Sequence, residues 1–102
     1  IIAELQARVT LKTNYWDTKK ACEILFPILK PGARVVNVSS AMGYLRRLEN
    51  ATNKEKAREN MNILASEDLT VEQLDGLMRN FEMAADAGNH EGGLEQLHIF
   101  SF

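Results

Sequence analysis

The side chains best placed to do chemistry are amides and hydroxyls inside apolar segments. Asn14 falls within a long helical pattern, where asparagine is slightly unfavourable, so a special role is favoured there. Asn37 and Ser40 stand at the end of a short valine-rich run. Such groups can donate and accept hydrogen bonds, and composition alone favours an ordinary Ser40 that hydrogen-bonds backbone groups.

Other reactive groups are few. Cys22 lies on an apolar helix stripe, where packing explains it better than reactivity, and a single cysteine cannot form an internal disulfide. His90 and His98 are separated by a Gly-Gly break and lie far along the chain from this cysteine. We therefore expect no metal site and a reducing, cytoplasmic location.

The composition is that of one small soluble domain. Of the 102 residues, 45% are hydrophobic and 25% are charged, and the net charge of −2 gives no reason to expect a nucleic-acid partner. No stretch reaches the roughly 20 apolar residues that cross a bilayer, and the start of the chain does not resemble a signal peptide. We expect neither membrane insertion nor secretion.

The first third of the chain has the periodicity of one long helix over residues 2–30. Its apolar residues fall on two faces, which favours burial between neighbouring elements. Pro27 either ends this helix or kinks its last turn, and Pro31 with Gly32 predicts the exit. One face holds Leu11, Tyr15, Cys22, Leu25 and Leu29, and the other holds Leu5, Val9 and Trp16.

A single strand is predicted at residues 33–39. The run from Arg34 to Val38 is β-branched and does not alternate, which is typical of a strand covered on both faces in a parallel sheet. A helix, a glycine-containing turn and a buried strand form the second half of a βαβ unit. Farther along, Ala57, Met61 and Leu64 indicate a helix over residues 51–65.

The best-marked helix begins after Thr70. Thr70 and Gln73 have the spacing of a capping box, and Leu69 and Leu74 have that of a hydrophobic staple. Gly88 is expected to end this helix. Its buried stripe is expected to contain Leu74, Leu77, Met78, Phe81 and Ala85.

Two segments carry a family resemblance. The helical sequence Thr13-Asn14-Tyr15-Trp16, followed by GARVVNVSSAMG at residues 32–43, resembles the middle of the short-chain dehydrogenases/reductases. That family has an asparagine in a long helix, then a strand ending in Asn-[Ile/Val]-Ser-Ser with a glycine three residues on. Residues 69–81, LTVEQLDGLMRNF, resemble the helical insertion of the monomeric carbonyl reductases. The resemblance covers about residues 7–92.

This resemblance implies an NADPH-dependent reduction of small ketones, aldehydes or quinones. By motif position, Ser40 is the serine that hydrogen-bonds the substrate carbonyl. Asn14 is the asparagine that kinks its helix and holds a water of the proton relay. Asn37 and Val38 would lie beside the nicotinamide of the cofactor.

The family's proton donor is a tyrosine in a Tyr-x-x-x-Lys pair. The pair would follow the insertion, but residues 94–102 contain neither Tyr nor Lys, and the Gly-rich phosphate turn is not found in these 102 residues. Tyr15 and Lys19 have the right spacing but precede the strand. We interpret them as a core aromatic residue and a solvated lysine.

These features predict the α/β class: a fragment of a Rossmann-type doubly wound sheet that is mostly helical in isolation. Residues 1–102 form one partial domain, with a helix–strand core at 1–43, a helical insertion at 44–90 and a divergent tail at 91–102. Open strand edges favour self-association. Two functions remain open: a carbonyl reductase-like oxidoreductase that is inactive as these 102 residues, and a non-catalytic helical interaction or structural protein.

Overall fold

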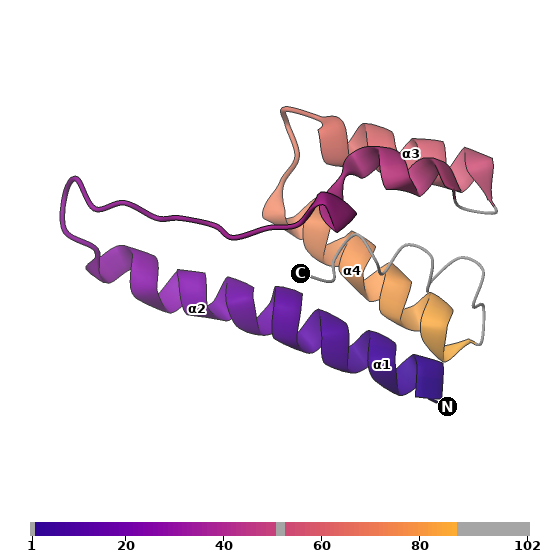
Figure 1. Cartoon of the computed structure of the whole chain (residues 1–102), viewed down its shortest axis with the longest axis horizontal. Coiled ribbons are helices and arrows are strands. Elements are labelled where there is room, and N and C mark those ends of the chain that lie inside the picture. The colour runs from indigo at the N-terminus through magenta and orange to yellow at the C-terminus, as the bar shows by residue number, and fades with distance from the viewer. Residues whose placement is uncertain (1, 51–52, 88–102) are drawn as a thin grey trace.

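The computed structural model describes residues 2–50 and 53–87, and helices dominate this part of the chain (Figure 1). A long first helix turns back through an extended segment at residues 33–40. The first helix consists of α1 (Ile2–Leu11), a π-helical turn (Lys12–Trp16), α2 (Asp17–Leu25) and a 3₁₀ turn (Phe26–Ile28). After the extended segment come 3₁₀ turns at Ala41–Gly43 and Leu45–Asn50, then α3 (Lys54–Ala65) and α4 (Val71–Asp86).

The first helix ends where its prolines and glycine predict. Pro27 lies in the terminal 3₁₀ turn, so the helix proper stops at Leu25. The next reversal is closed by the Ala33 N–H, which donates to the Lys30 carbonyl at 3.0 Å. Gly32 adopts a φ of +81°, the left-handed conformation that the third residue of such a turn requires.

The predicted strand at residues 33–39 is wrong for the described chain. The segment is extended, as its β-branched residues favour, but after the turn bond of the Ala33 N–H no described residue pairs with its backbone. Val35, Val36 and Val38 are 51%, 84% and 89% exposed. A strand needs a neighbour to satisfy its backbone groups, so the α/β class is not formed here, whereas the expectation of a mostly helical chain is confirmed.

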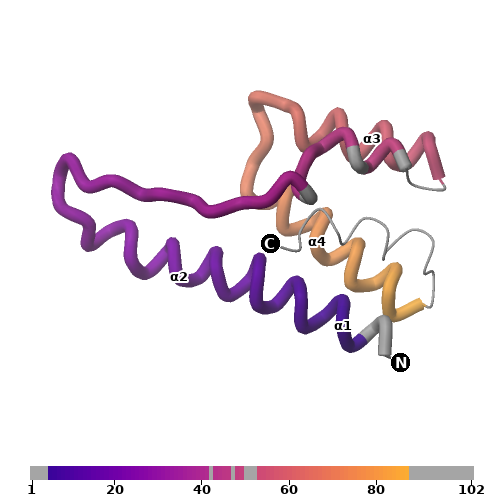
Figure 2. The backbone as a smooth tube through the Cα atoms, viewed as in Figure 1, coloured from indigo at the N-terminus to yellow at the C-terminus, as the bar shows by residue number. Residues whose placement is uncertain are grey.

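The core lies between α1 and α4, which run side by side (Figure 2). The stripe predicted for α4 is confirmed, with Leu74 half-buried at its margin. The buried residues of this core cluster are Ala7, Leu11, Leu77, Met78, Phe81 and Ala85, and packed against them are Tyr15, Trp16, Ile63, Leu64 and Leu74.

The prediction that the first helix is buried on two sides is wrong. Leu5 and Val9 on its second face are exposed, and so are Leu25 and Leu29 toward its end. In the described part of the chain α4 packs along α1, on the face that carries Leu11. Leu5, Val9, Leu25 and Leu29 therefore face solvent, whereas Trp16 packs at the margin of the core.

Both later helices begin at side-chain caps. Asn53 accepts from the Lys56 N–H at 3.0 Å and starts α3, and residues 51 and 52, included in the predicted helix, lie outside the described residues. Thr70 and Gln73 form the predicted capping box of α4, with bonds of 3.2 and 2.9 Å. The predicted terminal Gly88 also lies outside the described residues.

We call the contact of Ala7 and Leu11 of α1 with Leu77, Met78, Phe81 and Ala85 of α4 the seam. We expect this seam to contribute most of the free energy of unfolding. We expect Met78→Ala to cost about 2–5 kcal/mol, because Met78 is fully buried and its truncation leaves a cavity. Met83→Ala on the same helix is the matched control, because Met83 is 61% exposed and its truncation should cost under about 0.5 kcal/mol. Urea unfolding monitored by circular dichroism measures both changes, and equal costs would contradict this core.

Candidate functional site

Asn14 lies in the π-helical turn that interrupts the first helix. The Asp17 N–H binds the carbonyl of Lys12, five residues earlier, and the Thr18 hydroxyl donates to the Thr13 carbonyl at 3.1 Å. Turns of this kind are rare in proteins overall, but those that occur often lie at functional sites. The irregular backbone therefore coincides with the residue that the family resemblance places in the proton relay.

Ser40 lies at the other end of the candidate site, where the extended segment meets the turn Ala41–Gly43. Its carbonyl accepts from the Gly43 N–H at 2.9 Å, and its side chain is exposed. Asn37 and Val38 are exposed on the extended segment before it. Because no described strand holds this segment against the helix, the predicted cleft between Asn14 and Ser40 stays a prediction.

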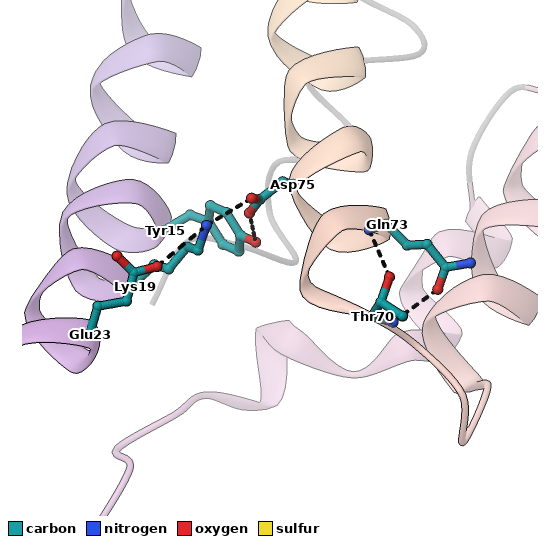
Figure 3. Close-up of polar contacts among 6 residues, drawn as sticks. All are labelled: Tyr15, Lys19, Glu23, Thr70, Gln73 and Asp75. Carbon is teal, nitrogen blue, oxygen red and sulfur yellow. Dashed lines mark hydrogen bonds and ion pairs between the residues drawn. The ribbon is translucent and has the colours of Figure 1, made fainter. Parts of the chain in front are cut away.

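The structure does bring together three residues that were not expected to meet. Asp75 of α4 accepts from the Tyr15 hydroxyl and from the Lys19 ammonium, each at 2.7 Å (Figure 3). Glu23 lies 3.6 Å from the same ammonium. Asp75 is only 9% exposed, and this burial makes its two partners necessary.

The three groups change one another's acidity. Hydrogen bonds from Lys19, and then from Tyr15, hold the pKa of Asp75 below its usual value, and the same bond raises the pKa of Lys19. Burial, together with the bond to Asp75, raises the pKa of Tyr15. A catalytic tyrosine paired with lysine needs the opposite shift, so this pair does not form the family's proton donor.

This arrangement corrects one sequence interpretation. Tyr15 packs at the core margin as expected, but Lys19 is paired with Asp75 and is not simply solvated. Asp75 itself was missed. The only available signal was a carboxylate at the edge of the apolar stripe of α4, and its partners lie 56 and 60 residues away.

Further polar contacts continue along the same helix pair. The Trp16 indole N–H donates to Glu82 at 3.0 Å, and the Arg79 guanidinium lies 5.3 Å from the centre of that ring. Arg8 donates twice to Asp86, at 2.7 and 3.1 Å. In these hydrogen bonds the first helix supplies the donors and α4 supplies the carboxylates, whereas Arg79 of α4 brings a cation to the Trp16 ring.

The described residues were also compared with the requirements of a metal site and of a membrane span. They contain no group of three or more His, Cys, Asp and Glu side chains that could hold a metal ion. The predictions for His90 and His98 fall outside the described residues. Cys22 is half-buried and free. None of the helices described is long and apolar enough to span a bilayer.

Comparison with known proteins identifies similar sequences. The chain is 42% identical over 86 residues to carbonyl reductase [NADPH] 1 of Rattus norvegicus and 39% identical over 87 residues to that of Homo sapiens. It is 47% identical over 66 residues to carbonyl reductase [NADPH] 3 of Rattus norvegicus. The matches cover 84%, 85% and 65% of this chain but 29%, 29% and 24% of those proteins.

This chain therefore spans less than a third of the length of the curated relatives that it matches. No protein-family model and no solved structure matches it.

We expect Tyr15→Phe to destabilise the chain by about 1–2 kcal/mol, because it removes a hydrogen bond to a charged, mostly buried partner. Tyr44→Phe is the matched control, since Tyr44 is exposed and its ring contact with Arg46 does not need the hydroxyl. Urea unfolding at neutral pH compares the two. Equal effects would show that the Tyr15 hydroxyl contributes nothing.

Asp75 should make the free energy of unfolding depend on pH. Its pKa is lower in the folded chain, so its contribution is complete above the unfolded aspartate value of about 3.9 and is lost as pH falls through the folded value. The Asp75→Asn variant should have a lower free energy of unfolding than the parent chain at neutral pH. Its free energy of unfolding should also fall less as the pH is lowered. Asp68→Asn, at an exposed position, is the control, and unfolding curves that fall in parallel for all three chains would oppose this role.

Proposed function

Because this chain is homologous to one segment of the NADPH carbonyl reductases, which are short-chain dehydrogenases/reductases, we propose that it contributes part of a carbonyl reductase active site. The observation that carries the proposal is the 86-residue match at 42% identity. The sequence places Ser40 and Asn14 at the family's serine and asparagine positions. The π-helical turn at Asn14 supports the second assignment.

In this role Ser40 donates its hydroxyl hydrogen to the oxygen of a bound ketone, aldehyde or quinone. The bond strengthens as negative charge develops on that oxygen, so it favours the transition state over the bound substrate. Asn14, in the widened helical turn, holds a water through which the proton can be replaced. These two residues orient and stabilise, but neither supplies the proton.

The described residues do not by themselves fit NADPH. Asn37 and Val38, which would contact the nicotinamide, are exposed on an extended segment. A pyrophosphate also needs backbone N–H groups at a Gly-rich helix start, and no such sequence occurs among the 102 residues. We therefore assign the cofactor to the assembled reductase, in a cytoplasmic setting, and derive no step through it in this chain.

A second candidate is a non-catalytic interaction role. The observation that favours it is the extended segment at residues 33–40, whose valines are exposed. Unpaired strand edges bind other strands through backbone hydrogen bonds. This role needs neither cofactor nor substrate.

A chimera tests the reductase proposal by supplying the rest of the fold. The matched segment of the rat carbonyl reductase is replaced by the corresponding residues of this chain, and NADPH consumption is followed with menadione or isatin. We expect Ser40→Ala to lower kcat by about 100-fold or more, because one hydrogen-bond donor to the developing oxyanion is lost. The 102-residue chain alone should give no turnover above buffer.

Ser39→Ala is the matched control in the same chimera, since the neighbouring serine is also exposed and has no assigned contact with the substrate. A folded chimera in which both alanine variants turn over like the parent would disprove the role of Ser40. Turnover by the isolated chain would disprove the claim that the reaction needs the assembled fold.

A further inference from the structure

The π-helical turn Lys12–Trp16, which we call the wide turn, departs from the regular hydrogen-bond pattern of the first helix. In a regular α-helix the Asp17 N–H would bind the Thr13 carbonyl, four residues earlier. Here it binds the carbonyl of the first residue of the wide turn, and the Thr18 hydroxyl donates to the Thr13 carbonyl at 3.1 Å. Helices seldom leave the regular pattern. We therefore expect contacts outside the first helix to favour the wide turn over the regular one.

Two carboxylates of α4 bind the two aromatic residues at the end of the wide turn. Asp75 accepts from the Tyr15 hydroxyl at 2.7 Å, and Glu82 accepts from the Trp16 indole N–H at 3.0 Å. Asp75 and Glu82 lie about two helical turns apart, so they share one face of α4. Tyr15 and Trp16 directly follow Asn14 in the sequence. Their attachment to α4 therefore restricts the backbone at Asn14.

Contacts with α4 on both sides of the wide turn favour the same hydrogen-bond register. Leu11, just before the turn, is fully buried in the core that α4 shares. Lys19, beyond the turn, donates to Asp75 at 2.7 Å, so Asp75 binds one residue inside the wide turn and one after it (Figure 3). Closing the turn to the regular pattern would misalign Leu11 and Lys19 with respect to α4. These contacts therefore stabilise the wide turn in preference to the regular one.

Two cations also approach the ring of Trp16. The Lys19 ammonium lies 5.9 Å from the ring centre, and the Arg79 guanidinium lies 5.3 Å from it. Cations within about 6 Å of an indole centre are attracted to the face of the ring. Lys19 belongs to the first helix and Arg79 to α4, so the ring joins the two helices at the wide turn.

We propose that Asp75 and Glu82 are positioning residues, which keep the wide turn open and so set the placement of Asn14. They act through the side chains of Tyr15 and Trp16, and have no assigned contact with substrate or cofactor. This inference rests on the proposed function, in which Asn14 holds a water of the proton relay. It gives α4 a part in the reaction that the motif positions do not reveal.

NMR scalar couplings across hydrogen bonds test the first step in the 102-residue chain. In the parent chain the Asp17 amide nitrogen should couple to the carbonyl carbon of Lys12. In the double variant Asp75→Ala Glu82→Ala the coupling should move to the carbonyl carbon of Thr13, because the regular turn is no longer opposed. A folded double variant in which the coupling to Lys12 keeps its parental size overturns the proposal.

Asp86→Ala is the matched control. Asp86 is also a carboxylate of α4 that binds the first helix, but its partner Arg8 lies in α1, before the wide turn. This variant should leave the Asp17 coupling at Lys12, and a coupling that moves here as well would show a general loosening of the helix pair.

Tyr15→Phe covers the case in which the double variant does not fold, because it keeps the ring in the core and removes only the bond to Asp75. It should weaken the Asp17–Lys12 coupling in the 102-residue chain, since one of the two bonds that favour the wide turn is lost. A folded Tyr15→Phe chain whose coupling keeps the parental size overturns the proposal.

Kinetics of the chimera with the rat carbonyl reductase test the second step. Asp75→Ala Glu82→Ala should lower kcat by about tenfold or more, because Asn14 is displaced. KM should change by less than about twofold, because the assigned substrate contact of Ser40 remains. The D₂O solvent isotope effect on kcat should rise as proton transfer slows. Asp86→Ala should leave kcat and the isotope effect as in the parent.

The isotope effect separates a positioning role from a purely structural one. If the double variant only lowered the amount of folded enzyme, kcat would fall while the isotope effect kept its parental value, and the positioning role would be overturned.

This inference and the proposed function fail in different measurements. Ser40→Ala tests the proposed function without touching the carboxylates of α4. If Ser40→Ala turns over like the parent, the proposed function fails, and the Asp17 coupling alone decides whether α4 holds the wide turn. If Ser40→Ala lowers kcat while the double variant changes neither kcat nor the isotope effect, the proposed function stands and the positioning role of Asp75 and Glu82 is overturned.

Discussion

The described structure depends on the apolar seam between α1 and α4 and on the buried carboxylate beside it. Leu11 and Met78 remove apolar surface from water, while Asp75 is kept charged in a shielded position by Tyr15 and Lys19. Each feature needs the other. Without the seam the carboxylate would be solvated and its partners unnecessary, and without the partners a buried charge would oppose the seam.

This seam joins the parts of the chain to which different roles are assigned. α1 leads directly into the π-helical turn with Asn14, and α4 begins at the capping box of Thr70. The extended segment with Ser40 lies between them in the chain but outside the seam. The helical part of the candidate site is therefore held in place by packing against α4, whereas the extended segment lies outside this packing.

The sequence predicted what is determined locally. The start of α4 follows from Thr70 and Gln73, which are three residues apart, and its buried stripe follows from helical spacing. The prediction of a strand at residues 33–39 was wrong because the residues of a segment can favour an extended conformation by themselves, whereas pairing requires a second strand. Asp75 was missed because its burial depends on Tyr15 and Lys19, which no local pattern connects to it. Ser40 and Asn14 were assigned from motif position, which carries no information on their distance.

The π-helical turn at Lys12–Trp16 has a consequence for how insertions and deletions act on this chain. Each residue of a helix advances its neighbours by about 100° around the axis, so the extra residue in the wide turn sets α2 out of phase with α1. Deleting one residue there would act as a rotation of α2 rather than as the loss of a side chain. Leu25 and its exposed neighbours would swing to a different side of the axis while Leu11 stayed in the seam.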